Sequence, residues 1–166
     1  MRCMGCGAAM RLDDDKEFLI YDYCGSVYCP DPNDRGIRDL GETTGLSCSL
    51  CTVPMVHAAI AGKRVSYCRQ CRGILIGMDL FATLVQTLRT KNNSAVEVLQ
   101  PPDWNGLQRQ MNCPQCRQQM NTHLYGGPGN IIIDNCEQCS LNWLDDGELQ
   151  RIIGAPDRQY ETRRRG

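Results

Sequence analysis

The sequence predicts a small β-rich protein, built from three tandem β-hairpin units with short α-helices. Three observations lead to this fold class. The chain contains 12 cysteines, which fall into three sets of four. The first Cys-x2-Cys pair of each set is followed four residues later by methionine, at Met10, Met55 and Met120. The chain has only 2 Phe to fill a core, whereas its 16 Gly and 8 Pro favour turns. We therefore expect several small repeated units in place of one large core.

The cysteine sets indicate bound metal ions. Each unit is too small to bury enough apolar surface alone, whereas a structural Zn²⁺ contributes roughly 10 to 16 kcal/mol. Two strands with a cysteine pair at each end bring four thiolates to one point, which is a zinc ribbon. We therefore expect three Zn²⁺ per chain, held by Cys3, Cys6, Cys24 and Cys29; by Cys48, Cys51, Cys68 and Cys71; and by Cys113, Cys116, Cys136 and Cys139.

The first set departs from this pattern. The residue three before the fourth cysteine is Cys68 in the second set and Cys136 in the third, but Tyr21 stands three before Cys24. We expect Cys29, which follows across "GSVY", to replace the lost ligand. A three-cysteine site, a metal-free site and Tyr21 as a phenolate ligand are the alternatives, although the unperturbed tyrosine pKa of about 10 disfavours the last.

Disulfides are the alternative for all three sets, because 12 is an even number. The N-terminus has no basic region followed by an apolar stretch, so we expect no secretory signal. A reducing, cytoplasmic location is therefore expected, in which paired cysteines bind metal.

The elements follow in chain order. Zinc ribbon 1, the atypical one, is expected over 1–30, with a hairpin whose tip carries Asp13–Asp15. A linker covers 31–47. Zinc ribbon 2 covers 48–91 and ends in an amphipathic helix with Asp79 as N-cap; its apolar face comprises Leu80, Phe81, Leu84, Val85 and Leu88.

A second linker is expected over 92–112, and zinc ribbon 3 over 113–154. The hairpin of ribbon 3 turns at "GGPG", and a shorter helix follows with Leu149, Ile152 and Ile153 on one face. Residues 155–166, with three arginines at 163–165, are expected to form a flexible tail.

The second cysteine pair of ribbon 3 runs into a distinctive motif, "NWLDDGEL", with Trp143, Leu144, Asp145, Gly147, Glu148 and Leu149 at its key positions. This stretch resembles the transcription factor IIB-type zinc ribbon family, clearest over 113–153. The resemblance is weaker over 48–88, where Leu75 and Ile76 replace the Trp-Leu pair, and extends only to the general plan over 3–29. It implies zinc and a ribbon fold but little about activity. The family usually has Gly after the fourth ligand, so Ser140 predicts a different turn.

Several other residues have ordinary structural explanations. The three methionines are expected to fill the small cores beside the cysteines, and Trp143 is expected to cover apolar surface. His57 and His123 are expected to be strand residues outside the metal sites.

Closed four-sulfur sites leave no position for a substrate or an activated water, so we expect neither an enzyme nor a small-molecule substrate. The longest apolar run is far below the about 20 residues that span a bilayer. Twelve thiolates and three Zn²⁺ change the formal net charge of −1 to about −7. Such a chain is repelled by phosphate backbones, which favours a docking subunit of a larger protein complex facing the cytoplasm. Nucleic-acid binding and a rubredoxin-like iron electron carrier are the alternatives.

Overall fold

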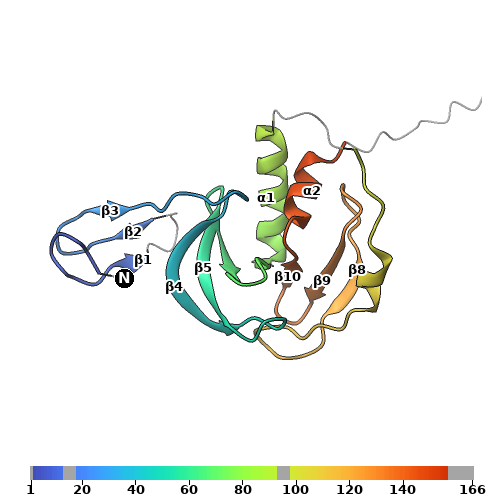
Figure 1. The fold of residues 1–166 in the computed structure, drawn as a ribbon, viewed down its shortest axis with the longest axis horizontal. Coiled ribbons are helices and arrows are strands. Elements are labelled where there is room, and N and C mark those ends of the chain that lie inside the picture. The colour runs from blue at the N-terminus through green and yellow to red at the C-terminus, as the bar shows by residue number, and fades with distance from the viewer. Residues whose placement is uncertain (1, 13–17, 93–97, 157–166) are drawn as a thin grey trace, which may run out of the picture.

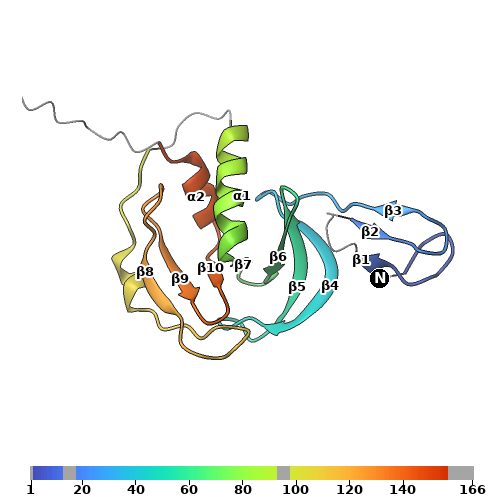
Figure 2. The same ribbon diagram turned by 180° about the vertical axis from the view of Figure 1, so that it is seen from behind.

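Two separate β-sheets organise the protein, one of three strands and one of seven. The computed structural model describes residues 2–12, 18–92 and 98–156, so the expected acidic tip and the arginine tail lie outside the described residues. The small sheet has the order β1-β2-β3, formed by Arg11–Leu12, Leu19–Ile20 and Val27–Tyr28. Figures 1 and 2 show that this first unit projects away from the remainder of the molecule.

The large sheet joins the second and third ribbons into one body. Its order is β4-β5-β6-β7-β10-β9-β8, and all neighbouring strands are antiparallel. Its strands are β4 Arg38–Ser47, β5 Pro54–Ile60, β6 Lys63–Tyr67, β7 Ile74–Gly77, β8 Asn121–Leu124, β9 Ile132–Cys136 and β10 Leu141–Leu144. The hairpins expected in ribbons 2 and 3 are confirmed as β5–β6 and β8–β9.

The junction between these two ribbons is nearly symmetric. Strands β7 and β10 each end their own ribbon, and they pair antiparallel with Leu75 opposite Trp143. Both residues lie seven positions after the first cysteine of the preceding turn. The flanking pairs, Ile74 with Leu144 and Ile76 with Asn142, are interchanged by a half-turn about that central pair. The two ribbons are therefore arranged like the subunits of an isologous dimer within one chain.

Gly73 is a point of close approach at this junction. A Cβ at Gly73 would lie 2.1 Å from Cζ2 of Trp143 and 2.7 Å from its Cη2, and the indole is fully buried, with 0 % exposure. We expect Gly73→Ala to lower the free energy of unfolding by about 1–3 kcal/mol, because the overpacked ring has no free space to enter. Denaturant unfolding of the zinc-loaded protein measures this.

Gly126→Ala is the matched control, since a Cβ at Gly126 meets nothing within 4 Å. Equal midpoints for the two variants would contradict the close packing inferred at Gly73.

Two α-helices cover one face of the large sheet. Helix α1 (Met78–Lys91) and helix α2 (Glu148–Gly154) lie side by side in both views (Figures 1 and 2). The predicted apolar faces are confirmed, because the core between helices and sheet includes Phe81, Leu84, Val85, Leu149 and Ile152. Helix α1 differs at its start, where Gly77 is the N-cap and Asp79 lies in the first turn; there its charge still favours the helix dipole. No helix in the described part of the chain could cross a bilayer.

The expected linker over 31–47 is largely a strand. Strand β4 covers the outer edge of β5, pairing Arg38 with Ala59 and Thr43 with Val56. Its register shifts twice, between Asp39 and Thr43 and between Thr43 and Ser47. Gly41 and Gly45 have φ values of 82° and 79° within it. These irregularities interrupt the alternation by which a strand is recognised in sequence.

The second expected linker, 92–112, is also structured where it is described. A 3₁₀-helix, η1, covers Trp104–Gln108 beside β8. Met111, 2 % exposed, packs in the same buried cluster as Met120 and Cys113. This segment therefore forms part of the folded body.

Candidate metal centres

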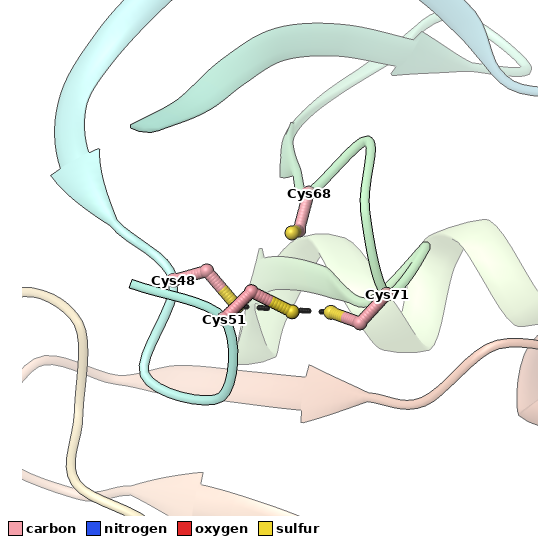
Figure 3. A group of neighbouring side chains, drawn as sticks. All are labelled: Cys48, Cys51, Cys68 and Cys71. Atoms are coloured by element: carbon pink, nitrogen blue, oxygen red, sulfur yellow. Dashed lines mark hydrogen bonds between the residues drawn. The ribbon is translucent and has the colours of Figure 1, made fainter. Parts of the chain in front are cut away.

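Four cysteines of the second ribbon come together from two turns. Cys48 and Cys51 lie between β4 and β5, while Cys68 and Cys71 lie between β6 and β7. Figure 3 shows the two pairs facing each other, and all four sulfurs lie within 4.8 Å of one another. Cys113, Cys116, Cys136 and Cys139 of the third ribbon form a second such group.

The spacing of the sulfurs fits tetrahedral zinc. Four sulfurs each 2.3 Å from one ion would lie about 3.8 Å apart. The Sγ atoms of Cys48 and Cys71 are 3.7 Å apart, and those of Cys116 and Cys136 are 3.6 Å apart. A disulfide would require about 2.05 Å, and none of the 12 cysteines forms one. The donor set therefore fits Zn²⁺, and the disulfide alternative does not describe this structure.

One backbone turn recurs at the cysteine pairs. In the first turn of ribbon 2, Cys48 N–H donates to the Val53 carbonyl and Thr52 N–H donates to the Cys48 carbonyl, both at 2.9 Å. The same two bonds form in the turns that begin at Cys3, Cys68 and Cys113. The residue after the second cysteine of each Cys-x2-Cys pair has a positive φ, at Gly7, Thr52, Arg72, Arg117 and Ser140, and so does Gly25, which follows Cys24.

The turn at Ser140 differs from the others in its hydrogen bonding. In the four turns above, the N–H at the matching position donates to the carbonyl of the first cysteine, whereas the N–H of Ser140 donates to the Glu137 carbonyl at 3.3 Å. The Ser140 φ of 53° lies in the left-handed region that glycine favours and other residues occupy at a cost. The expected difference at this turn is therefore confirmed in its hydrogen bonding, although Ser140 keeps the positive φ of the other turns.

Burial and backbone hydrogen bonds have opposite effects on the pKa of these thiols. Burial raises the pKa of Cys48, and the backbone N–H groups of Cys51 and Leu50 oppose that rise by donating to its sulfur. Burial, with hydrogen bonds that the Cys139 thiol donates to Cys116 and Cys136, raises the pKa of Cys139 to about 12. Thiols with a raised pKa do not ionise near neutral pH without a cation, so metal binding must release protons.

Buried sulfur and apolar side chains surround both groups. Met55 and Met120 are 0 % and 3 % exposed and belong to the cluster that contains the cysteines, Leu75 and Trp143. The methionines therefore fill the core beside the metal sites and Trp143 covers apolar surface, as predicted. His57 and His123 lie in β5 and β8, outside the cysteine groups.

The first unit gathers three cysteines. The sulfurs of Cys3, Cys6 and Cys24 lie within 4.8 Å of one another, with Cys24 Sγ at 4.0 Å from Cys3 and 3.8 Å from Cys6. Cys29 lies outside this group, so the structure does not bring the expected substitute ligand to it. Strand β3 runs back beside β2, pairing Tyr28 with Leu19, and three extended residues after Ser26 carry Cys29 about 10 Å away from the turn.

A comparison with protein families identifies the third unit. Residues 112–155 match the model of the family described as "Transcription factor zinc-finger", of the transcription factor IIB zinc-ribbon type. This segment is similar to IIB-type zinc ribbons. It covers about a quarter of the chain, and ribbons 1 and 2 are assigned from their cysteine geometry. Neither the curated proteins nor the solved structures gave a match.

The motif of the IIB-type ribbon forms a hydrogen-bonded link between β10 and α2. Trp143 Nε1–H donates to the Asp145 carboxylate at 2.9 Å, and Asp145 N–H donates to the Glu148 carboxylate at 2.7 Å. Gly147, with φ of 86°, makes the turn into the helix. The Trp-Leu-Asp and Gly-Glu-Leu parts of the motif thus fix one side of the ribbon junction.

Arg109 extends this network and was missed in the sequence. Its guanidinium donates to both the Asp134 and the Asp145 carboxylates. Asp134 is fully buried and also accepts from the Thr122 hydroxyl. No spacing signal connects an arginine in an apparent linker with an aspartate 25 residues later, so only the fold reveals this ion pair.

Glu148 is the titrating member of this network. Burial, with the charge of Asp145, raises the pKa of its carboxyl to about 7 against the hydrogen bond from Asp145 N–H. The folded state therefore keeps this proton up to about pH 7, while the unfolded chain releases it near pH 4.3. The contribution of protonated Glu148 to the free energy of unfolding is therefore complete below about pH 4.3 and is lost as the pH rises through 7. From pH 6 to pH 8, the wild type should lose about 1 kcal/mol relative to Glu148→Gln.

Urea unfolding of both zinc-loaded proteins from pH 6 to pH 8 measures this difference in stability. Zinc binding has the same pH dependence in the two proteins, so its contribution cancels in the comparison. Gln keeps an oxygen acceptor for Asp145 N–H. Parallel stability curves for the two proteins would contradict the raised pKa.

Proposed function

We propose that this protein is a non-catalytic, zinc-binding docking subunit of a larger cytoplasmic protein assembly. The closed sulfur sites of ribbons 2 and 3 support a structural role for their zinc, because no coordination position is left for substrate. The shared sheet gives these ribbons a single rigid body on which a further surface can be presented.

The observation that carries the proposal is the apolar surface of the first unit. Met4, Tyr23, Val27 and Tyr28 are 102 %, 85 %, 61 % and 41 % exposed. Among the residues of this unit that the structure describes, the buried cluster comprises Cys3, Met10, Leu19 and Tyr21. A concentration of large exposed apolar side chains on one small unit is typical of a protein-binding surface.

Charge favours a protein partner over a nucleic acid. Zinc held by thiolates makes an already acidic chain more negative. The basic residues near the second turn of ribbon 2 are also paired, Arg69 with Asp39, and Arg72 with Asp34. These pairs leave little unopposed positive charge for phosphate contacts at that turn.

Co-purification from the native host, with zinc retained, tests the docking surface. We expect a defined protein partner at a constant ratio to the wild type, and its loss from the variant Tyr23→Ser/Val27→Ser. Leu50→Ser is the control, because Leu50 is an exposed apolar residue, 43 %, on ribbon 2. A partner retained equally by all three proteins would place docking elsewhere and contradict the proposal.

The family matched by residues 112–155 is described as a transcription factor zinc-finger, which makes nucleic-acid binding the second candidate. Fluorescence anisotropy with single- and double-stranded oligonucleotides decides between them. Binding at low salt that weakens steeply as salt rises would favour this second function. Metal analysis of the same sample tests the iron-carrier alternative, which requires iron in place of zinc.

A further inference from the structure

We infer that the first unit binds Zn²⁺ through three thiolates and leaves the fourth coordination position open to an external thiolate. Cys3, Cys6 and Cys24 supply the three sulfurs. Cys24 Sγ lies 4.0 Å from Cys3 Sγ and 3.8 Å from Cys6 Sγ. Sulfurs on tetrahedral zinc are expected to lie about 3.8 Å apart, so these distances fit the ion. Among the described residues, no other Cys, His, Asp or Glu side chain joins this group.

The backbone identifies the position of the missing ligand. Tyr21 N–H donates to the Ser26 carbonyl at 2.9 Å, and Gly25 N–H donates to the Tyr21 carbonyl at 2.8 Å. Cys68 makes the same two bonds, at 3.0 Å to Gly73 and 2.8 Å from Arg72. The turn is therefore conserved in form while its first sulfur is replaced, and the Tyr21 ring packs into the small core with Met10 and Leu19.

Exposure separates this site from the other two. Cys6 and Cys24 are exposed, whereas every cysteine of the second and third groups is buried or half-buried. Neighbouring Met4 and Tyr23 project into solvent and do not cover the sulfurs. A donor from outside the chain can therefore approach an ion at this site, which is not so at the two closed sites.

The chemistry selects the class of donor. Zinc in a protein is almost always four-coordinate, and an incomplete protein set is completed by water or by another ligand. A site already made of thiolates favours a further soft donor. A thiolate fits best, from a small thiol or from a cysteine side chain of a partner protein.

Cobalt substitution of the full chain tests this inference, because Co²⁺–thiolate absorption reports the number of bound sulfurs. In buffer with a phosphine reductant and no thiol, we expect three Co²⁺ per chain, with one bound by three sulfurs. Addition of 2-mercaptoethanol, or of a terminally blocked peptide with one cysteine, should convert that ion to four sulfurs. A stronger response to the peptide than to 2-mercaptoethanol would indicate a protein cysteine as the natural donor, and the reverse would indicate a small thiol; the peptide with serine in place of cysteine should have no effect.

Three variants assign the response. Tyr21→Cys should close the site and abolish the response to thiol, and Cys24→Ser should remove the responsive ion. Cys29→Ser should behave as the wild type. Four sulfurs at every ion in the thiol-free wild type, or only two bound metal ions per chain, would overturn the inference.

Zinc release to a colorimetric chelator provides a second readout. We expect one of the three ions to leave the wild type in a fast phase, and Tyr21→Cys to lose that phase. A fast phase of unchanged amplitude in Tyr21→Cys would equally overturn the open site.

Discussion

Cys68→Ser is expected to unfold the third ribbon as well as the second. The substitution removes a fully buried ligand and with it most of the roughly 10 to 16 kcal/mol that a structural zinc provides. Because β7 of ribbon 2 pairs along its whole length with β10 of ribbon 3, the loss should extend across the junction. Trp143, which packs on Gly73 and lies opposite Leu75, should become exposed to water.

Tryptophan fluorescence measures this effect. Trp104→Phe provides the background, because Trp104 is 59 % exposed and would otherwise contribute a solvent-like signal. In that background we expect a red shift of Trp143 emission in Cys68→Ser, together with the loss of zinc from both ribbons.

Cys24→Ser is the control, since the first unit has its own sheet and its own cluster. It should lose one zinc ion and leave Trp143 emission unchanged. A Cys68→Ser protein that loses one ion and keeps a buried Trp143 would show that the two ribbons fold independently.

The sequence contains strong local signals for the ribbons and none for their union. Cysteine spacing locates the turns because zinc geometry tolerates little variation. The β5–β6 hairpin turns at Ala61 and Gly62, which have φ values of 46° and 80°, as expected of a two-residue loop. The pairing of Leu75 with Trp143 cannot be predicted in this way. The two residues are ordinary apolar positions 68 residues apart, and no local pattern indicates that they are in contact.

The errors in the sites have the same physical origin. Cys29 is close to Cys24 in the sequence, which led to the prediction that it is a ligand. The strand after Cys24 runs away from the cysteine group, so Cys29 does not reach it. Comparison of the internal repeats predicts that Tyr21 occupies the substituted ligand position, but only the backbone hydrogen bonds show that its turn remains intact. Local patterns predicted which residues could bind metal, and strand direction decided which of them converge.

Arg109→Met is expected to destabilise the body formed by ribbons 2 and 3 by about 3–5 kcal/mol. The change removes the cation that pairs with Asp134, whose carboxylate is fully buried. The Thr122 hydroxyl still donates to that carboxylate, but a single hydroxyl does not offset the cost of a buried charge. Asp145, which is 36 % exposed, can regain water, so most of the penalty should arise at Asp134. Urea unfolding with zinc content measured in parallel tests this, because Asp134 lies two residues before the ligand Cys136 in β9.

A second substitution identifies the cause of that penalty. Arg109→Met/Asp134→Leu removes both charges and should recover much of the lost stability, because an apolar pair can replace a buried ion pair at little cost. Arg69→Met is the matched control: its pair with Asp39 is solvent-exposed, 57 % and 34 %, and should contribute no more than about 1 kcal/mol. If Arg109→Met costs no more than Arg69→Met, Asp134 is not held as a buried anion, and the link between η1, β9 and α2 does not depend on charge.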